Sequence, residues 1–311
     1  MVRLAFVFPG QGAQYVGMGK ELCEQFTTAR EVFERADEAL GFKLSRVCFT
    51  GPAEELDRTE VTQPAILVAS LAAYAVLQAE GVTPCLAAGL SLGEYSALTA
   101  AGVLELETAV RLVAKRGRIM QEAVPEGAGM MAAIMGLEHA IVEEACSRAS
   151  ESGIVDIANY NCPGQLVISG ERQAVLQAAE FMKEAGGKVI PLSVSVPSHS
   201  RLMKEAAQLL AAELDGINWG QPGFPVVSNV SAQEILPGEF TTLLVKQLFS
   251  PVRWEQSVEY MAGQVDYFVE VGPGKVLSGF IKKKARRQLL GNVEDVASLT
   301  RTLDRVKEVL S

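Results

Sequence analysis

The chain has 311 residues, of which 49% are hydrophobic, and its formal net charge is −9. That length exceeds a typical single domain, so we expect one large core with an inserted or appended smaller domain. The negative charge argues against nucleic acid as the main partner. No continuous apolar run reaches transmembrane length and no basic leader precedes the first strand, so we expect a cytoplasmic protein without a membrane partner. The five cysteines form no C-x-x-C pair, which is typical of free thiols and predicts no metal site.

The first predicted element is the apolar strand Leu4–Phe8, followed by Gly10-Gln11-Gly12. Glycines at these positions let the backbone approach a second loop closely while the glutamine side chain points at a site. A glutamine amide is a suitable neutral donor to an oxyanion. A solvated glutamine in a glycine-rich turn fits the same residues.

A G-x-S-x-G motif spans residues 89–93 and has Ser91 at its centre. The apolar run Cys85–Ala88 before it predicts a short buried strand, and Glu94–Ala101 after it predicts a helix. Ser91 then lies on the sharp turn between them, which is the setting of a nucleophile elbow. There it would meet the N–H groups of a helix N-terminus, which favour a developing oxyanion. Chance occurrence in a glycine-rich chain is the alternative.

The helical stretch 112–120 carries three basic residues, Lys115, Arg116 and Arg118. Because a guanidinium forms bidentate bonds with a carboxylate, an arginine here suits the binding of an acid-bearing substrate. Spacing does not choose between Arg116 and Arg118, and each alone fits a solvated helix charge.

Residues 126–197 predict an inserted ferredoxin-like subdomain, because their elements follow the order β-α-β-β-α-β. The predicted elements are strand 130–136, helix 138–150, strand 155–160, strand 165–169, helix 171–185 and strand 188–191. Helical spacing predicts two buried faces, formed by Ile141, Val142, Ala145 and Cys146 and by Val175, Leu176, Ala179 and Met182.

The flanking segments 1–125 and 198–311 alternate strands and helices, which predicts one large α/β domain with a parallel sheet, similar to the α/β-hydrolases. Its later strands are expected at Pro225–Val230 and Tyr267–Val271. Pro125–Gly129 and Pro191–Pro197 are the predicted hinges. The active site is expected in the cleft between the two domains.

The chain has two histidines, and a serine nucleophile needs a base. His139 begins an amphipathic helix and is predicted to be a surface residue. His199 follows an extended segment and lies 108 residues after Ser91, so we predict that it is the base. No acidic residue stands out as a third member among Glu94, Asp156, Asp215 and Asp266, and a backbone carbonyl could orient the imidazole equally well.

Eight motifs now occur in one order along the chain. Together they resemble the malonyl-CoA:acyl-carrier-protein transacylase family, the acyltransferases of fatty acid and polyketide synthesis, from residue 3 to about residue 285. The motifs are Phe8-Pro9-Gly10-Gln11-Gly12-Ala13-Gln14, Gly51-Pro52-Ala53-Glu54-Glu55-Leu56, Thr62-Gln63-Pro64-Ala65, the elbow with Gly93-Glu94-Tyr95-Ser96-Ala97-Leu98, Arg116-Gly117, Asn159-Tyr160-Asn161, Ser198-His199 and Glu270-Val271-Gly272-Pro273-Gly274-Lys275.

The resemblance implies roles for single residues. Ser91 matches the acyl-accepting serine of the family and His199 its general base. Gln11 and the backbone N–H of Leu92 match the donors of the oxyanion hole.

Further matches concern substrate binding. Arg116 matches the arginine that pairs with the malonyl carboxylate, and Gln63 and Asn161 match pocket residues. Gln247 matches the residue whose main-chain carbonyl orients the catalytic histidine. Many family members have histidine directly before the serine, whereas this chain has Leu90, so the resemblance leaves its acyl selectivity open.

The resemblance therefore implies two-step transfer of a malonyl group from malonyl-CoA to the phosphopantetheine thiol of acyl carrier protein, through a malonyl-serine, by a monomer without its own cofactor. Three alternatives stay open. A serine esterase or thioesterase shares the elbow but predicts an acidic triad residue and no need for Arg116. An acyltransferase serving a polyketide synthase differs only in its carrier. A catalytically silent scaffold would dock the carrier without reacting.

Carrier proteins of this system are typically acidic, so docking on an acidic enzyme calls for a local basic patch. The densest run is Lys282, Lys283 and Lys284 with Arg286 and Arg287, at the end of a predicted helix. A solvated helix C-terminus, where cations favour the dipole, explains the same residues.

Overall fold

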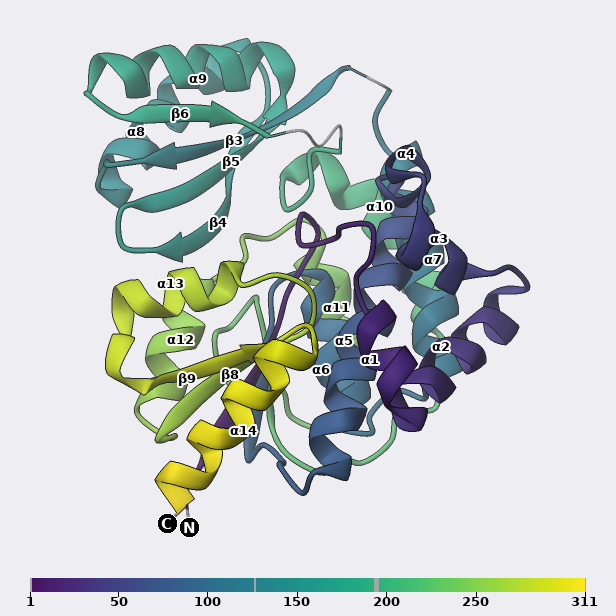
Figure 1. Ribbon diagram of the computed structural model, residues 1–311. Coiled ribbons are helices and arrows are strands. Elements are labelled where there is room, and N and C mark those ends of the chain that lie inside the picture. The colour runs from purple at the N-terminus through teal and green to yellow at the C-terminus, as the bar shows by residue number, and fades with distance from the viewer. Residues whose placement is uncertain (1, 126, 193–195, 311) are drawn as a thin grey trace.

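The computed structural model describes residues 2–125, 127–192 and 196–310. The described residues form two separate sheets, one of five parallel strands and one of four antiparallel strands (Figure 1). The parallel sheet consists of β1 (Leu4–Phe8), β2 (Leu86–Gly89), β7 (Val226–Val227), β8 (Tyr267–Val271) and β9 (Leu289–Val293). The fold is therefore α/β with a smaller antiparallel unit, as predicted.

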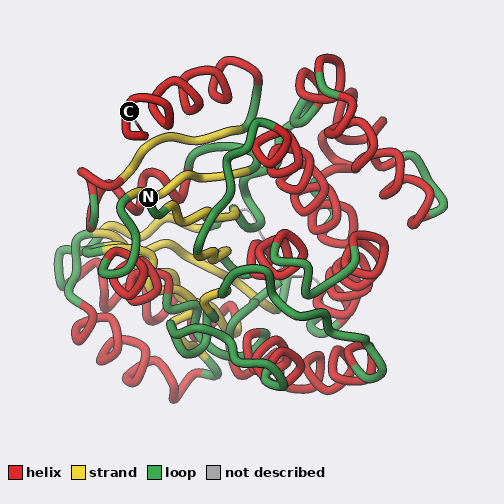
Figure 2. The backbone as a smooth tube through the Cα atoms, turned by 90° about the horizontal axis from the view of Figure 1, so that it is seen from below, coloured by secondary structure: helices red, strands yellow, loops and turns green. Residues whose placement is uncertain are grey.

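The parallel sheet has the strand order β7-β2-β1-β8-β9, with β1 in the centre. Leu4, Phe6 and Phe8 of β1 pack into one core, while Ala5 and Val7 pack into another that contains Trp254. This alternation is expected of a sheet covered on both faces, and helices flank both sides of it in Figure 2. The predicted strand 225–230 is reduced to the two residues of β7.

The helices of the larger unit surround this sheet. They are α1 (Lys20–Gln25), α2 (Thr27–Leu40), α3 (Leu44–Thr50), α4 (Ala53–Leu56), α5 (Thr59–Ala79), α6 (Leu92–Ala100), α7 (Leu106–Glu122), α10 (Lys204–Leu214), α11 (Phe240–Gln247), α12 (Trp254–Ala262), α13 (Val276–Lys284) and α14 (Val296–Leu310). Short 3-10 helices occur at Ser150–Ser152, Arg201–Met203 and Arg286–Gln288.

Helix α5 is long and apolar enough to cross a membrane by length and composition, although we expected no such segment from continuous apolar runs. In the folded chain, 89% of its most apolar window is buried. It packs against α7 and α2 and is a core helix of the larger unit.

The antiparallel sheet belongs to the inserted segment. Its strands are β3 (Gly129–Met135), β4 (Val155–Cys162), β5 (Gln165–Glu171) and β6 (Lys188–Pro191), and its helices are α8 (His139–Ala149) and α9 (Arg172–Glu184). The strand order is β4-β5-β3-β6, so the first and third strands of the unit, β3 and β5, lie in the centre. This is the order expected of the predicted β-α-β-β-α-β unit.

The predicted buried helix faces are wrong at two positions. Ile141 is 39% exposed and Leu176 is 42% exposed, whereas the buried faces are completed by Ala149 in α8 and by Ala174 and Ala178 in α9. Each buried stripe is narrow, because only one face of each helix packs against the small sheet, so Ile141 and Leu176 at its edge remain outside.

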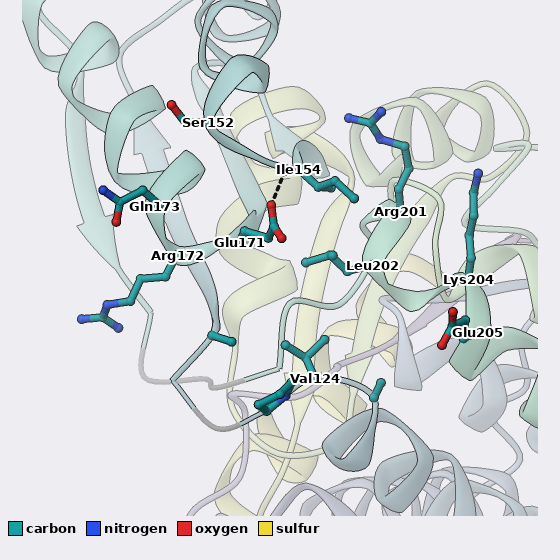
Figure 3. A pocket seen from close by; sticks show the side chains of 13 residues that line it. Val124, Ser152, Ile154, Glu171, Arg172, Gln173, Arg201, Leu202, Lys204 and Glu205 are labelled. Carbon is teal, nitrogen blue, oxygen red and sulfur yellow. Dashed lines mark hydrogen bonds between the residues drawn. The ribbon is translucent and has the colours of Figure 1, made fainter.

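The junction of the two units contains an open crevice of about 810 Å³ on the side of the predicted hinges. Val124, Ser152, Arg172, Arg201 and Lys204 are among its lining residues, and Figure 3 shows the Arg172 side chain directed away from those of Arg201 and Lys204. Glu126 and residues 193–195 of the predicted hinges lie outside the described residues. The boundaries at 126 and 197 stay predictions.

Candidate active site

Ser91 lies on the turn between β2 and α6, as the motif predicts. Its φ of 52° is in the left-handed region, which costs a non-glycine residue about 1–3 kcal/mol. The two motif glycines make this turn possible. A Cβ on Gly89 would lie 1.9 Å from the backbone of Gly93, and one on Gly93 would lie 2.1 Å from the carbonyl oxygen of Phe8. Leu92 is the first residue of α6, so its N–H is free of helical acceptors.

His199 is brought to Ser91 from the other end of the inserted segment. Its Nε2 lies 2.8 Å from Ser91 Oγ, and its Nδ1 lies 2.8 Å from the main-chain oxygen of Gln247. A carbonyl oxygen only accepts, so Nδ1 carries the hydrogen and Nε2 is left to accept the serine proton. The imidazole is thus oriented by a carbonyl rather than by an acid, which was one of the two arrangements left open.

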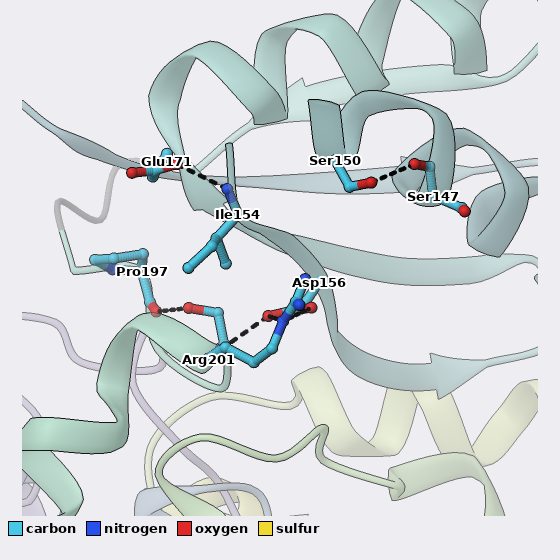
Figure 4. Close-up of polar contacts among 8 residues, drawn as sticks. Ser147, Ser150, Ile154, Asp156, Glu171, Pro197 and Arg201 are labelled. Carbon is cyan, nitrogen blue, oxygen red and sulfur yellow. Dashed lines mark hydrogen bonds and ion pairs between the residues drawn. The ribbon is translucent and has the colours of Figure 1, made fainter. Parts of the chain in front are cut away.

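The backbone of His199 has a φ of 60°, so its loop needs support on both sides. The His199 N–H donates to Leu248 O at 3.0 Å. Two residues further on, the Arg201 N–H and Nε both donate to the carboxylate of Asp156 on β4, at 2.8 and 2.9 Å (Figure 4). Asp156, one of the acidic candidates, therefore ties the loop to the small sheet instead of touching the imidazole.

Arg116 and Arg118, which the sequence left undecided, have different surroundings. Arg116 is 1% exposed, and its Nη2 donates to Ser91 Oγ at 3.2 Å. Its guanidinium also donates to Gln63 Oε1 at 2.8 Å and to Gln247 Oε1 at 3.1 Å. Arg118 is on the surface and pairs with Glu60. Only Arg116 can reach a group attached to the serine.

A cavity of about 280 Å³ opens onto Ser91 between the two units. Gln11, Asn161 and His199 line it, together with Leu90. Within the described part of the chain, Asn161 Oδ1 is buried and has no hydrogen-bond partner, so it is available to a ligand. Arg116, Gln63 and Gln247 lie behind the serine instead of on the cavity wall. An acyl group on Ser91 would extend from the cavity toward the guanidinium.

Burial, and then the nearby Arg116 charge, lower the pKa of His199 to about 4. The imidazole is therefore neutral near pH 7 and can act as a proton acceptor. Burial also raises the pKa of Glu94 to about 7, against the effect of its hydrogen bonds from Asn229 and Gln247. The other histidine, His139, is partly exposed and lies 3.4 Å from Glu255.

Two further buried residues lie beside the serine: Glu94, which the sequence offered as one of several acidic candidates, and Asn229, which it did not single out. Asn229 Oδ1 accepts the Ser91 N–H at 2.6 Å, and Glu94 accepts the Asn229 N–H at 2.8 Å. Asn229 follows the short strand β7. A polar residue at the carboxyl end of a strand in a parallel sheet is the signal that could have identified it.

The predicted basic patch is exposed at the end of α13. Lys284 pairs with Glu255 and Glu259 at 3.6 and 3.2 Å. Among the described residues, no ion pair involves Lys282, Lys283 or Arg287. The first turn of the same helix, with Val276 and Leu277, lines the cavity that opens onto Ser91.

The chain is similar to known proteins over nearly its whole length. The model of the acyl transferase domain family matches residues 5–307. The malonyl CoA-acyl carrier protein transacylase of Escherichia coli strain K12 is 51% identical over 287 residues, which cover 91% of this chain and 93% of the relative.

Two solved structures are also similar. The malonyl CoA-acyl carrier protein transacylase of Clostridium perfringens superposes with a TM-score of 0.96 at 45% identity, over 99% of this chain and 98% of that one. A malonyl-transacylase in complex with its type II PKS acyl-carrier protein superposes with a TM-score of 0.95 at 46% identity, over 97% of this chain and 99% of that one. This chain therefore belongs to the acyl transferase family.

Proposed function

We propose that this protein transfers the malonyl group of malonyl-CoA to the phosphopantetheine thiol of acyl carrier protein through a malonyl ester of Ser91. One observation supports this most directly: Ser91 Oγ is 2.8 Å from His199 Nε2 and 3.2 Å from Arg116 Nη2. The first contact activates a nucleophile and the second provides a cation for an acidic acyl group. The relatives named as malonyl transacylases support the same substrate.

In the first half-reaction, Ser91 Oγ attacks the thioester carbonyl while its proton passes to His199 Nε2. The Gln11 amide and the Leu92 N–H are the proposed donors to the oxyanion, and one such donor is typically worth about 3 kcal/mol. When the C–S bond breaks, the leaving coenzyme A thiolate takes the proton from His199. Arg116 binds the malonyl carboxylate, and this contact replaces the one between Arg116 Nη2 and Ser91 Oγ.

The second half-reaction reverses these steps with a different thiol. The phosphopantetheine thiol gives its proton to His199 and attacks the Ser91 ester, and the serine oxygen leaves with that proton. Nucleophile, base and donors all belong to this chain, so the proposed chemistry needs no metal or cofactor of its own. It also needs one copy of the chain, and the monomeric state and cytoplasmic location stay predictions.

We further assign carrier docking to the exposed end of α13. The helix starts at Val276 on the cavity wall and reaches Lys283 about 10 Å further on, at 1.5 Å per residue. An acidic carrier bound at Lys282, Lys283 and Arg287 would thus lie next to the cavity into which its thiol must extend. The carrier in the related complex is named as a type II PKS protein, so a polyketide carrier is a second candidate alongside a fatty acid carrier.

Incubation with malonyl-CoA followed by intact-mass measurement tests the reaction class. A stable malonyl adduct that disappears in Ser91→Ala and is discharged by carrier protein supports transfer. Rapid release of malonate without an adduct would identify a hydrolase. Absence of any reaction would identify a scaffold. His199 Nδ1 contacts Gln247 O, and no carboxylate of the described residues takes that place, which favours transfer over a triad esterase.

A further inference from the structure

Glu94 is a buried carboxylate three residues after the nucleophile, and neither half-reaction uses it. It lies in the first turn of α6 and is 0% exposed. Its Oε2 accepts two hydrogen bonds, from the Asn229 N–H at 2.8 Å and from Gln247 Nε2 at 3.0 Å. Its Oε1 has no partner within the described residues. A carboxyl group buried in such a place is costly unless it is hydrogen-bonded, so these two donors are what its position depends on.

The first of these bonds leads to the nucleophile. Asn229 Oδ1 accepts the Ser91 N–H at 2.6 Å, and Asn229 Nδ2 donates to Gly89 O at 2.7 Å. The asparagine side chain therefore holds the two peptide groups on either side of Leu90, which lead into the strained residue Ser91. Its own carbonyl is held in turn by the Arg253 N–H at 2.9 Å. Glu94 accepts the backbone N–H of Asn229 and so fixes the backbone position from which the Asn229 side chain extends.

The second bond leads to the base and to the guanidinium. Gln247 carries the main-chain oxygen that accepts from His199 Nδ1, and its Oε1 accepts from Arg116 Nη2. Its Nε2 donates to Glu94 Oε2 and to the Ser91 carbonyl oxygen, each at 3.0 Å, and has a longer contact of 3.4 Å with Asn229 Oδ1. The amide group is thus held by an acceptor on one side and a cation on the other, which leaves it a single orientation.

We propose that Glu94 is a positioning residue, whose carboxylate aligns Ser91, His199 and Arg116 with one another through Asn229 and Gln247. The proposal deepens the proposed acyl transfer and rests on it. In a catalytic triad, an acid next to the imidazole aligns the histidine with the serine. In this protein we assign that alignment to a carboxylate on the far side of the serine. The carboxylate acts through two amides and touches neither the substrate nor the imidazole.

The alignment can be measured without the substrate, by the rate at which a fluorophosphonate labels Ser91 and releases fluoride. That reaction needs the serine and the base but no carboxylate site. We expect Glu94→Ala and Asn229→Ala each to slow labelling by about 100-fold, the typical effect of a misplacement of about 1 Å. Glu94→Gln keeps one acceptor oxygen for both donors and should remain within about threefold of the parent rate.

Asp37→Ala is the matched control. Asp37 is also a buried carboxylate, 6% exposed, and it accepts two hydrogen bonds from Ser45, but it lies in α2 away from the serine. It should lower the melting temperature about as much as Glu94→Ala and leave labelling unchanged. If Glu94→Ala fails to fold, Asn229→Ala keeps the proposal refutable, because the link from Glu94 to Ser91 runs through the Asn229 side chain and a parent-like labelling rate without it would overturn the proposal.

Parent-like labelling in folded Glu94→Ala or Asn229→Ala would overturn the proposal, as would an equal loss in Asp37→Ala. Recovery of the rate in Glu94→Gln, with loss in the alanine variants, would support it. Malonyl-CoA is tested separately with the parent protein. Failure to form a malonyl adduct there would refute the proposed function, while the labelling rates would still report on the alignment.

Discussion

Replacement of Arg116 by alanine should change acyl selectivity more than any other single substitution in this site. Arg116 is buried, and its Nη2 lies 3.2 Å from the oxygen that receives the acyl group. A carboxylate held by two charge-assisted hydrogen bonds of about 1.5–3 kcal/mol each is stabilised by about 3–6 kcal/mol. Loss of both should lower malonyl transfer relative to acetyl transfer by about 10²- to 10⁴-fold.

The ratio of the malonyl transfer rate to the acetyl transfer rate isolates the contribution of the Arg116 contact with the carboxylate. Arg116→Ala also leaves Gln63 Oε1 and Gln247 Oε1 without their donor and opens a void, but these costs fall on malonyl and acetyl transfer alike. Acetyl transfer bears these costs, but it also gains from removal of a buried cation that an acetyl group leaves unpaired, so we expect acetyl-CoA to acylate Ser91 about as fast as before or faster. The assay is the single-turnover rate of acyl-enzyme formation from each thioester, followed by intact mass after rapid quenching.

The same variant should move the pH dependence. The Arg116 charge is the second cause, after burial, of the lowered pKa of His199, which is about 4. A cation near a base favours its neutral form, so removing the cation raises the pKa. The acid limb of the pH–rate profile for acetyl transfer should shift to higher pH in Arg116→Ala. It should stay in place in Arg116→Lys, which keeps the charge but cannot form the bidentate hydrogen bonds of a guanidinium.

Arg118→Ala is the control, because Arg118 is only two residues away and pairs with Glu60 on the surface. Equal losses for malonyl and acetyl transfer in Arg116→Ala would refute the reasoning and make Arg116 a structural residue. A selectivity change in Arg118→Ala would do the same.

The remaining predictions concern the base, the carrier and the junction of the two units. His199→Ala should slow acylation by at least about 100-fold at every pH, since general-base catalysis contributes that much, and a rate that recovers at high pH would point to a different base. Reversal of Lys282 and Lys283 to glutamate should raise the KM for carrier protein several-fold and flatten its salt dependence, with acylation by malonyl-CoA unchanged; unaltered carrier kinetics at low and high salt would assign the patch to solubility. Asp156→Ala should cost little stability, about 1 kcal/mol or less for a partly exposed pair, yet lower kcat for both substrates because Arg201 no longer anchors the histidine loop; parent kcat values at unchanged melting temperature would show that the loop needs no such anchor.

The local features of the site could be predicted from the sequence, because each depends on a few neighbouring residues. The elbow requires glycine at positions 89 and 93, where a Cβ would collide with backbone, so the motif itself encodes the turn. The order of elements in 129–191 likewise follows from short-range hydrophobic periodicity. With only one well-placed histidine in the chain, the pairing of Ser91 with His199 needed little more.

Only the tertiary structure decided which polar groups converge on the serine. Arg116 and Arg118 are equivalent by spacing, and burial of one face of α7 directs Arg116 alone toward Ser91. Asn229 and Glu94 are separated by 135 residues, and their contact depends on β7 lying beside β2 in the sheet. Strand β9 was not predicted, because the charged residues before it indicated only a helix end. Local sequence encodes turns and periodicity, whereas contacts between distant segments arise when the sheet order brings the ends of its strands to one edge.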